Sequence, residues 1–335
     1  FVFGFTRAAV AVDTACSASL VTIHLAFADR SNASAHACVG VNYVLARETC
    51  EMVRAAGMLA ADGRCKAFDA AADGYGRAEA AACHVFRSTS DGDGDGGDGD
   101  DTASFVVRAS ACGQDGRSAS LTAPNGPSQT RVVVEATRAL GEDERTFDVS
   151  THGTGTALGD PIECESLKNA FARARTPLTL TASKSCVGHA EAAAGSAATH
   201  QLAARLVADE TPVVVGLRVV NPYARVPTTF RVPRARSSAT RRARVAGCSA
   251  FAFTGTNAHV VVGTFSKDAA PATAPTRRFA FHRDAFWSCA TPPDALARAH
   301  RVVATPFSST LATTLTFDVR TTYIARASAC AATAR

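Results

Sequence analysis

The sequence predicts a layered α/β fold, because short apolar runs and helical segments alternate along the chain. Apolar runs typical of buried strands occur at residues 9–12, 147–150 and 178–182. Each leads into a turn of small residues or glycines, and most of these turns open a helical segment. Strands that alternate with helices in this way are typical of a sheet covered by helices. The chain has 335 residues and is 47% hydrophobic, which is enough for a sizeable core and excludes a mainly disordered protein.

The remaining expected elements follow the same pattern. A helix is expected to start near Cys16, with Leu20, Ile23, Leu25 and Phe27 giving it a buried, apolar character. Further strands are expected at residues 105–107, 244–249 and 257–263, and further helices at residues 127–140 and up to about residue 209. The last two strands are joined by a turn rich in Phe and Gly.

Composition excludes several classes of protein. No apolar run reaches the roughly 20 residues that a transmembrane helix needs. The 11 cysteines are odd in number and form no C-x-x-C pair, so neither a zinc site nor a redox dithiol is indicated. A long, apolar chain with scattered cysteines is more typical of a reducing compartment with buried thiols. We therefore expect a cytoplasmic protein without a bound metal.

Charge is distributed unevenly along the chain. Residues 218–335 contain 17 Lys and Arg against 4 Asp and Glu, a balance of +13, which leaves −8 for residues 1–217. Such a basic segment could attract an acidic partner protein or a nucleic acid. A solvated, arginine-rich surface is the simpler interpretation and we favour it. No aromatic residues alternate with the basic ones, so binding to nucleic acid is not expected.

Two stretches are not expected to belong to the layered core. Residues 91–101 contain only Asp and Gly, a composition that predicts a flexible acidic loop. After residue 263 the alternating pattern is lost: residues 264–276 form an Ala/Pro/Thr linker, and residues 277–287 (RRFAFHRDAFW) form an aromatic and basic motif.

The segment VDTACSASL (residues 12–20) could hold a nucleophile. Cys16 stands where a strand would turn into a helix, and there free N–H groups and the helix dipole stabilise a thiolate. The small residues around it would leave its sulfur exposed, as in a nucleophile elbow. For a lone cysteine, an inert buried thiol would be the more common outcome.

Three further turns at strand ends contain polar or flexible residues. His152 lies in THGTGT, which lacks the lysine of a phosphate-binding loop. Lys184 and His189 lie five residues apart in SKSCVGHAEAAAG, where a cation and an imidazole could neutralise a developing negative charge. The turn in SAFAFTGTNAH (residues 249–259) could present backbone N–H groups to a substrate oxygen. Taken singly, each feature could equally be structural.

Taken together, these motifs resemble the β-ketoacyl synthase (ketosynthase) family. The matching segments, with their order in the chain, are VDTACSASL, HGTGTALGDPIE, KSCVGH and GTNAHVVV. The segments AAGMLAADGRCKAFDAAADGY (55–75) and GQDGRSASLTAPNGPSQ (113–129) are similar to modular type I polyketide synthases more than to stand-alone fatty-acid enzymes. The resemblance covers about residues 1–263.

The resemblance implies a thiolase fold, with two βαβαβαββ halves in five layers (α-β-α-β-α) and a homodimeric assembly. We expect residues 1–110 to be the remainder of the first half and residues 111–263 to be the second half. Residues 264–290 would form a linker that ends in the motif found after such ketosynthases, and residues 291–335 a tail of uncertain order. The motif follows the ketosynthase-like region with no acyltransferase between them, which suggests an acyltransferase acting in trans or a missing exon.

The resemblance also implies roles for individual residues. Cys16 matches the nucleophile that accepts an acyl chain from a carrier-protein thioester. His152 and His189 match the pair that promotes decarboxylation of malonyl-carrier protein, and Lys184 matches the lysine that orders this site. The backbone N–H groups of Cys16 and Phe253 match the oxyanion hole.

Four residues are expected to contact the substrate. Thr154 and Thr156 match threonines that hydrogen-bond the phosphopantetheine arm of the carrier protein, and Phe251 and Asn257 belong to the matching Phe/Gly segment. The domain itself would bind no cofactor, because the carrier protein presents the substrates on its own arm. An acyl carrier protein, to which the basic C-terminal third could dock, is the expected partner.

The sequence also departs from the family pattern. Ala252 stands where the family usually has glycine, and Thr254 where it has glycine or serine. Ala78 and Ala80 also replace usual glycines. The chain starts at Phe1 and lacks most of the family's first half upstream of Cys16. A sheet without those strands would have an unpaired edge, so we expect this chain alone to be poorly stable or inactive. A heat-stable, dimeric and active recombinant protein would contradict that expectation.

Two other interpretations remain open at this stage. A fatty-acid condensing enzyme would use the same mechanism. A catalytically inert partner protein would share the fold, but such partners lack the nucleophile, which is present here as Cys16.

Overall fold

The computed structural model describes the residues that form the expected core. They are residues 7–29, 35–86, 105–120, 123–138, 140, 147–172, 177–208, 210–235, 237–238, 245–263 and 323–326. The chain divides into two compact units, and all described residues belong to the first of them. The acidic loop (91–101), the linker (264–290) and all of the tail except residues 323–326 lie outside the described residues.

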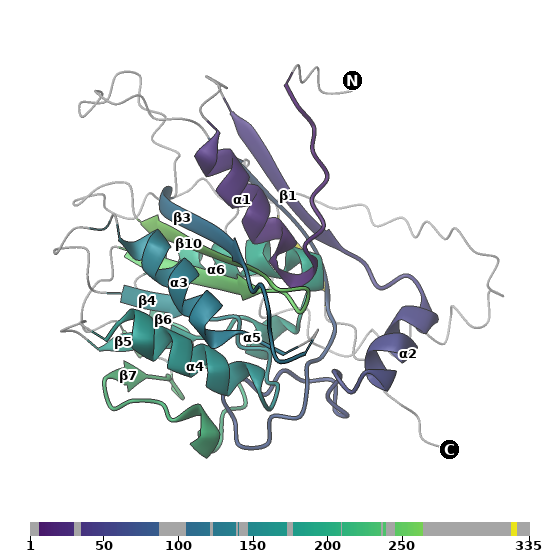
Figure 1. The fold of residues 1–335 in the computed structure, drawn as a ribbon, viewed down its shortest axis with the longest axis vertical. Helices are drawn as coiled ribbons and strands as arrows, with labels where there is room; N and C mark the ends of the chain where they lie inside the picture. The colour runs from purple at the N-terminus through teal and green to yellow at the C-terminus, as the bar shows by residue number, and fades with distance from the viewer. Residues whose placement is uncertain are drawn as a thin grey trace. The chain divides into compact units, whose positions relative to one another are not determined.

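A mixed sheet of six strands forms the centre of the described unit (Figure 1). Its strands, in spatial order, are β3 (Val106–Gln114), β10 (Thr256–Gly263), β9 (Val245–Phe251), β4 (Phe147–Ser150), β5 (Leu178–Thr181) and β7 (Phe230–Arg231). The pairs from β9 to β7 are parallel, whereas β10 is antiparallel to both β3 and β9. The strands predicted at 147–150, 178–182, 244–249 and 257–263 are therefore present, with small shifts at their ends.

Helices cover both faces of this sheet. On one face α3 (Gly126–Thr137) and α4 (Gly159–Ala170) pack side by side, and their core contains Val133, Leu167 and Leu180. On the other face α1 (Ala18–Ala28) and α6 (Ala194–Ala208) contribute Leu20 and Leu202. Every residue of β9 is buried, as expected for a strand covered on both sides.

A second sheet lies against the far side of α1 and α6. It contains β1 (His36–Asn42), β2 (Glu79–Phe86) and β11 (Tyr323–Arg326), all paired antiparallel. The helices approach β1 so closely that a Cβ atom on Gly40 would lie 2.8 Å from Ser19 Cβ and 2.9 Å from Ser196 Oγ. The order helix, sheet, helix, sheet gives four of the five predicted layers.

The remaining elements are short and connect the layers. They are η1 (Ala15–Ser17), α2 (Arg47–Ala55), α5 (Lys184–Val187), η3 (Glu191–Ala193), β6 (Glu210–Thr211), η4 (Pro222–Ala224) and β8 (Ser237–Ser238). Strand β3 runs across the predicted division of the chain at residues 110 and 111, and that division stays a prediction. Within the described ranges, no helix combines the length and the apolar character that a membrane span requires.

Local sequence explains where α3 begins. The side chain of Asn125 caps the helix by accepting a hydrogen bond from the backbone N–H of Ser128 at 3.2 Å, and Pro127 stands in its first turn. The helix ends at Thr137, three residues before the predicted end.

The prediction of a buried strand at residues 9–12 is wrong. These residues form no strand, and Val10 is 71% exposed. A strand exists only where a neighbour pairs with its backbone, and in the described part of the chain no strand is paired with this segment.

The prediction that Leu20, Ile23, Leu25 and Phe27 give α1 a buried, apolar character is also wrong in part. Leu20 and Ile23 are fully buried, but Leu25 and Phe27 are substantially exposed. Leu25 lies about half a turn around the helix from Leu20 and Ile23, so it is on the opposite side of the helix from these two buried residues. Phe27 stands in the last turn, near the helix end.

The core packing makes a direct prediction about stability. Leu180→Ala in β5, whose side chain is completely buried, should lower the free energy of unfolding by about 2–5 kcal/mol, because it removes buried methyl groups and leaves a cavity. Leu45→Ala, at an 88% exposed site, is the control and should change it by about 0.5 kcal/mol or less. Chemical denaturation measures both, and equal effects would show that this core is not formed as described.

Candidate active site

Cys16 lies in a tight turn at the start of α1. Ala15, just before it, adopts a left-handed conformation with φ of 52°, which is uncommon for a residue with a side chain. The Asp13 carboxylate supports this turn by accepting a hydrogen bond from the Ala15 N–H at 3.0 Å. The turn places the Cys16 sulfur at the head of the helix, facing the ends of the central strands.

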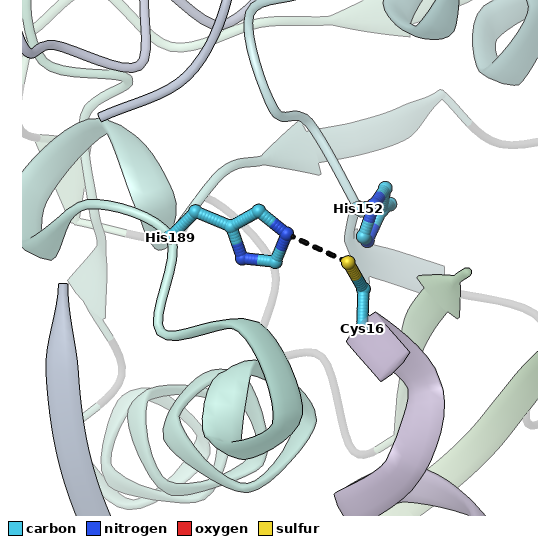
Figure 2. Close-up of side chains that lie close together, drawn as sticks. All are labelled: Cys16, His152 and His189. Atoms are coloured by element: carbon cyan, nitrogen blue, oxygen red, sulfur yellow. Dashed lines mark hydrogen bonds between the residues drawn. The ribbon is translucent and has the colours of Figure 1, made fainter. Parts of the chain in front are cut away.

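His189 contacts that sulfur directly. Its Nε2 atom lies 3.1 Å from Cys16 Sγ, as the dashed line in Figure 2 marks. Its other nitrogen, Nδ1, accepts a hydrogen bond from the backbone N–H of Glu191 at 3.1 Å. A neutral imidazole has one donor and one acceptor nitrogen. Because Nδ1 is the acceptor, Nε2 bears the proton and donates to the sulfur.

His152 completes a cluster of three reactive groups. It follows β4, and its ring centroid lies 5.5 Å from that of His189 and 5.9 Å from that of Phe251. The polar atoms of Cys16, His152 and His189 all lie within 4.8 Å of one another. Among the described residues, His152 Nδ1 has no hydrogen-bond partner, so this nitrogen is available to a substrate.

Burial controls the charge state of this cluster. It raises the pKa of the Cys16 thiol to about 11, against the opposing charge of Lys184. Burial, with the Lys184 charge added, holds the pKa of both His152 and His189 well below the ordinary value. At neutral pH the thiol is therefore protonated and both imidazoles are neutral. The prediction of an exposed sulfur is wrong, since Cys16 is buried, and desolvation outweighs the helix dipole that the sequence suggested.

Lys184 is the cation of the site. It begins α5 and is buried, and burial lowers the pKa of its ammonium group. Its charge acts on Cys16, His152 and His189 alike. The position predicted for an ordering lysine is thus occupied by a desolvated amine next to the three reactive groups.

Two buried carboxylates hold the loop that contains His152, and sequence reasoning assigned them no role. Glu163 accepts the backbone N–H groups of His152 at 2.7 Å and Gly153 at 2.8 Å. Asp160 accepts those of Gly155 at 3.1 Å and Phe68 at 2.7 Å. Burial raises the pKa of Glu163 to about 7 and that of Asp160 to about 6. The signal was two acidic residues one turn apart at the start of a helix that follows a glycine-rich loop.

The turn between β9 and β10 lies over the Cys16 sulfur. The backbone N–H groups of Phe253 and of Cys16 itself lower the pKa of the thiol, which places both donors next to the sulfur. Gly255 closes the turn with φ of +90°, and its N–H donates to the Ala252 carbonyl at 2.9 Å. Two converging N–H groups of this kind could bind an oxyanion.

Four further residues were predicted to contact the substrate, and their present contacts differ. Thr154 and Thr156 have their hydroxyl oxygens 3.2 Å apart, and Thr156 also accepts the Gly159 N–H. Phe251 is buried beside His152. Asn257 is buried too, but its amide donates to the Asp115 carboxylate at 2.6 Å, so its observed contacts support the turn. Substrate binding by these four residues stays a prediction.

The residues that depart from the family pattern are accommodated in different ways. Ala78 and Ala80 are buried in a small cluster with Ala190 and Ala193, where little room is left for larger side chains. Thr254 stands in the exposed turn, and its carbonyl oxygen accepts a hydrogen bond from Gln114 Nε2 at 3.4 Å.

A metal ion does not suit the three clustered side chains. Zinc would bind a nitrogen lone pair at about 2.0 Å, but the lone pair of His189 lies on Nδ1, where it accepts the Glu191 N–H. Moving the proton from Nε2 to Nδ1 would free Nε2 for a metal, but the Nδ1–H would then face the Glu191 N–H, and two donors repel each other. The Lys184 charge would also oppose a cation. The geometry fits organic nucleophilic chemistry better.

The described residues thus combine a layered α/β fold with a Cys-His-His cluster at strand and helix ends. Two sequence models match the chain, "Beta-ketoacyl synthase, N-terminal domain" over residues 1–92 and "Beta-ketoacyl synthase, C-terminal domain" over residues 104–217. The chain belongs to the β-ketoacyl synthase family.

Curated relatives are polyketide synthases. One component of the phenolphthiocerol/phthiocerol polyketide synthase of Mycobacterium tuberculosis is 39% identical over 269 residues, which cover 78% of this chain and 17% of the relative. The polyketide synthase GfsB of Streptomyces halstedii is 40% identical over 293 residues, covering 82% of this chain and 5% of the relative. The chain therefore spans less than a fifth of the length of these relatives.

Solved structures show the same fold. An oxazolomycin ketosynthase domain of Streptomyces albus has a TM-score of 0.73 and 31% identity, covering 79% of this chain and 48% of that chain. The module 6 ketosynthase of the bacillaene synthase of Bacillus subtilis has a TM-score of 0.71 and 30% identity, covering 76% and 47%. These similarities confirm the predicted thiolase fold of the ketosynthases.

The buried carboxylate of Glu163 predicts a pH-dependent effect on stability. Its pKa of about 7 in the folded protein lies above its ordinary value of 4.5, so the folded state keeps a proton that the unfolded state loses. This contribution is complete below the unfolded pKa and is lost as the pH rises to about 7. Glu163→Gln has no such titration, although it weakens the bonds to the loop.

The measurement is the free energy of unfolding at about pH 5 and about pH 7.5. The stability that Glu163→Gln loses relative to the original chain should be larger at the lower pH. Glu51→Gln, on the exposed side of α2, is the matched control and should show the same small difference at both values. An equal loss at both values for Glu163→Gln would mean that Glu163 is already ionised when buried.

Proposed function

We propose that this chain is the ketosynthase of a polyketide synthase and that it forms carbon–carbon bonds by decarboxylative condensation. The supporting observation is the 3.1 Å contact between Cys16 Sγ and His189 Nε2, with His152 beside it. A thiol, two neutral imidazoles and two backbone donors are the groups that this reaction needs.

In the first step Cys16 accepts an acyl chain. Its sulfur attacks the carbonyl carbon of an acyl thioester, a new C–S bond forms, and the bond to the departing thiol breaks. The proton of Cys16 ends on that departing thiol, so the exchange is balanced. The N–H groups of Cys16 and Phe253 stabilise the oxyanion that forms on the way.

In the second step a malonyl thioester loses carbon dioxide. The bond to the carboxylate breaks and its electron pair becomes a thioester enolate, so no strong base is required. His189 donates from Nε2 to the enolate oxygen, because Glu191 holds its other nitrogen as an acceptor. His152, whose Nδ1 has no hydrogen-bond partner among the described residues, offers the second hydrogen bond.

In the third step the enolate carbon attacks the acyl group on Cys16. A C–C bond forms, the C–S bond to Cys16 breaks, and the released thiolate takes up a proton from water. Burial favours this protonation of the thiolate, because it raises the pKa of the Cys16 thiol to about 11. The free thiol is then ready for another acyl chain.

The substrates would arrive on the phosphopantetheine arm of an acyl carrier protein, which is the proposed partner. Thr154 and Thr156 are the proposed contacts for that arm, and Phe251 and Asn257 border the acyl group. The assembly proposed for the complete ketosynthase is a homodimer, with an acyltransferase acting in trans. The curated relatives favour polyketides over fatty acids as products.

Acylation of the thiol can be tested directly. Intact-protein mass spectrometry after incubation with a short acyl thioester should show one added acyl group on the chain. Cys16→Ala should lose that adduct, whereas Cys186→Ala, which removes an exposed thiol, should retain it. An adduct that persists in Cys16→Ala would contradict the assignment of the nucleophile.

The role of the imidazoles is tested by the release of carbon dioxide. His189→Ala and His152→Ala should each slow decarboxylation of a malonyl thioester by about 10²–10⁴-fold, since each removes a positioned hydrogen-bond donor. His36→Ala, at a surface pair with Asp29, is the control and should leave the rate unchanged. Unchanged rates in both active-site variants would contradict the proposed step.

A further inference from the structure

Arg77 and Glu191 form a partly buried ion pair next to the reactive cluster. Arg77 donates from Nε and Nη2 to the two carboxylate oxygens of Glu191, each at 2.7 Å. The side chains are only 10% and 19% exposed. Two parallel bonds between planar groups fix the direction of both side chains, unlike a single contact at the surface.

The backbones of both partners contact His189. The N–H of Glu191 donates to His189 Nδ1, and Arg77 lies alongside His189 in a short parallel bridge. In that bridge the His189 N–H donates to the Gly76 carbonyl at 2.7 Å, and the Ala78 N–H donates to the His189 carbonyl at 2.9 Å. The His189 ring is therefore held by the Glu191 N–H, and the His189 backbone is held by the two residues that flank Arg77.

Glu191 needs this support because of its backbone. Its φ of 41° lies in the left-handed region, which residues with side chains rarely adopt. This φ sets where the Glu191 side chain and the following chain lie relative to the N–H that donates to His189 Nδ1. The ion pair anchors the side chain of Glu191 and so opposes a return to an ordinary conformation.

Arg77 is itself fixed by a third element. Its Nη1 donates to Thr49 Oγ1 at 3.0 Å and to Cys50 Sγ at 3.1 Å, both in α2. The guanidinium thus joins α2, the segment before β2 and the turn after α5. A lysine could not make all of these contacts, since only the planar fork supplies donors in several directions.

We propose that Arg77 and Glu191 are positioning residues, which act as one unit to hold the His189 ring with its Nε2–H on the Cys16 sulfur. The two residues do not touch the reacting atoms. The inference rests on the proposed function only in assigning His189 a role in the condensation. The hydrogen bond from His189 to the Cys16 sulfur can be tested without that reaction.

An ion pair that only stabilises the fold can be distinguished from one that positions His189. If the pair only held the fold together, its loss would loosen the site and expose the thiols. If it positions His189, its loss would remove a hydrogen bond from the Cys16 thiolate and make Cys16 less reactive. None of the substitutions below changes the other ionisable groups around His189, which are Lys184, His152, Tyr75, Cys16 and Cys65.

The experiment measures alkylation of each cysteine in the full chain by iodoacetamide, followed by peptide mass spectrometry, between about pH 7 and about pH 9. The variants are Arg77→Gln, Glu191→Gln, the double variant and Arg77→Lys. The control is Arg47→Gln, which breaks an exposed Arg–Glu pair in α2. Exposed Cys186 is the internal reference, and buried Cys65 reports loosening.

Each single Gln variant should slow alkylation of Cys16 by about tenfold at every pH, which is the effect of losing one hydrogen bond to a charged group. The double variant should be no slower than either single one, because the two residues act as a unit. Arg77→Lys should fall in between, and Arg47→Gln should match the original chain. Cys186 should react at one rate throughout.

Two results would overturn the proposal. An unchanged rate at Cys16 in the Gln variants would show that His189 keeps its place without the pair. A faster rate at Cys16 together with Cys65 would show that the pair only stabilises the fold. Because alkylation needs no carrier protein or malonyl group, neither result depends on whether the chain condenses acyl thioesters.

Discussion

Burial of ionisable groups around one sulfur is the constraint on which the rest of the site depends. Cys16, His189, Lys184, Glu163 and Asp160 are all nearly inaccessible to water. A charge in such a place is costly unless it is paired or hydrogen-bonded. The structure meets that cost in different ways: the thiol stays protonated and His189 stays neutral, whereas the carboxylates accept backbone N–H groups.

The layered architecture is what makes this burial possible. The reactive turns all stand at strand or helix ends, where α1 and α6 run between two sheets and exclude solvent. Close approach of these layers requires small residues, as Gly40 shows opposite Ser19 and Ser196. The same close packing fixes the loops, so each reactive side chain has few orientations. Position and desolvation of the site therefore have a common origin in the packing of α1 and α6.

Local pattern predicted much of this structure, because strands and motifs are local features. The apolar runs at β4, β5, β9 and β10 predicted these four strands of the central sheet, whereas β7 was not predicted. The segment at residues 9–12 has the same local character but forms no strand, since strand formation also depends on a neighbour. Arg77 and Glu191 escaped sequence reasoning for a related reason: 114 residues separate them, and nothing in either segment indicates the other.

The pKa of the nucleophile also could not be anticipated from a motif. The helix N-terminus suggested a stabilised thiolate, yet desolvation outweighs it, even with the Lys184 charge added, and gives a resting thiol. This is compatible with acyl exchange, because the attacking thiol transfers its proton to a departing thiol of similar chemistry and no net charge has to be created. In the proposed reaction, negative charge develops on oxygen instead, where the fixed N–H groups of Phe253 and Cys16 and the Nε2–H of His189 can meet it. Donors that are already oriented need no reorganisation when this charge develops. The hydrogen bond from Glu191 to His189 Nδ1 therefore matters for the reaction, because it keeps the proton on Nε2, at the other side of the ring.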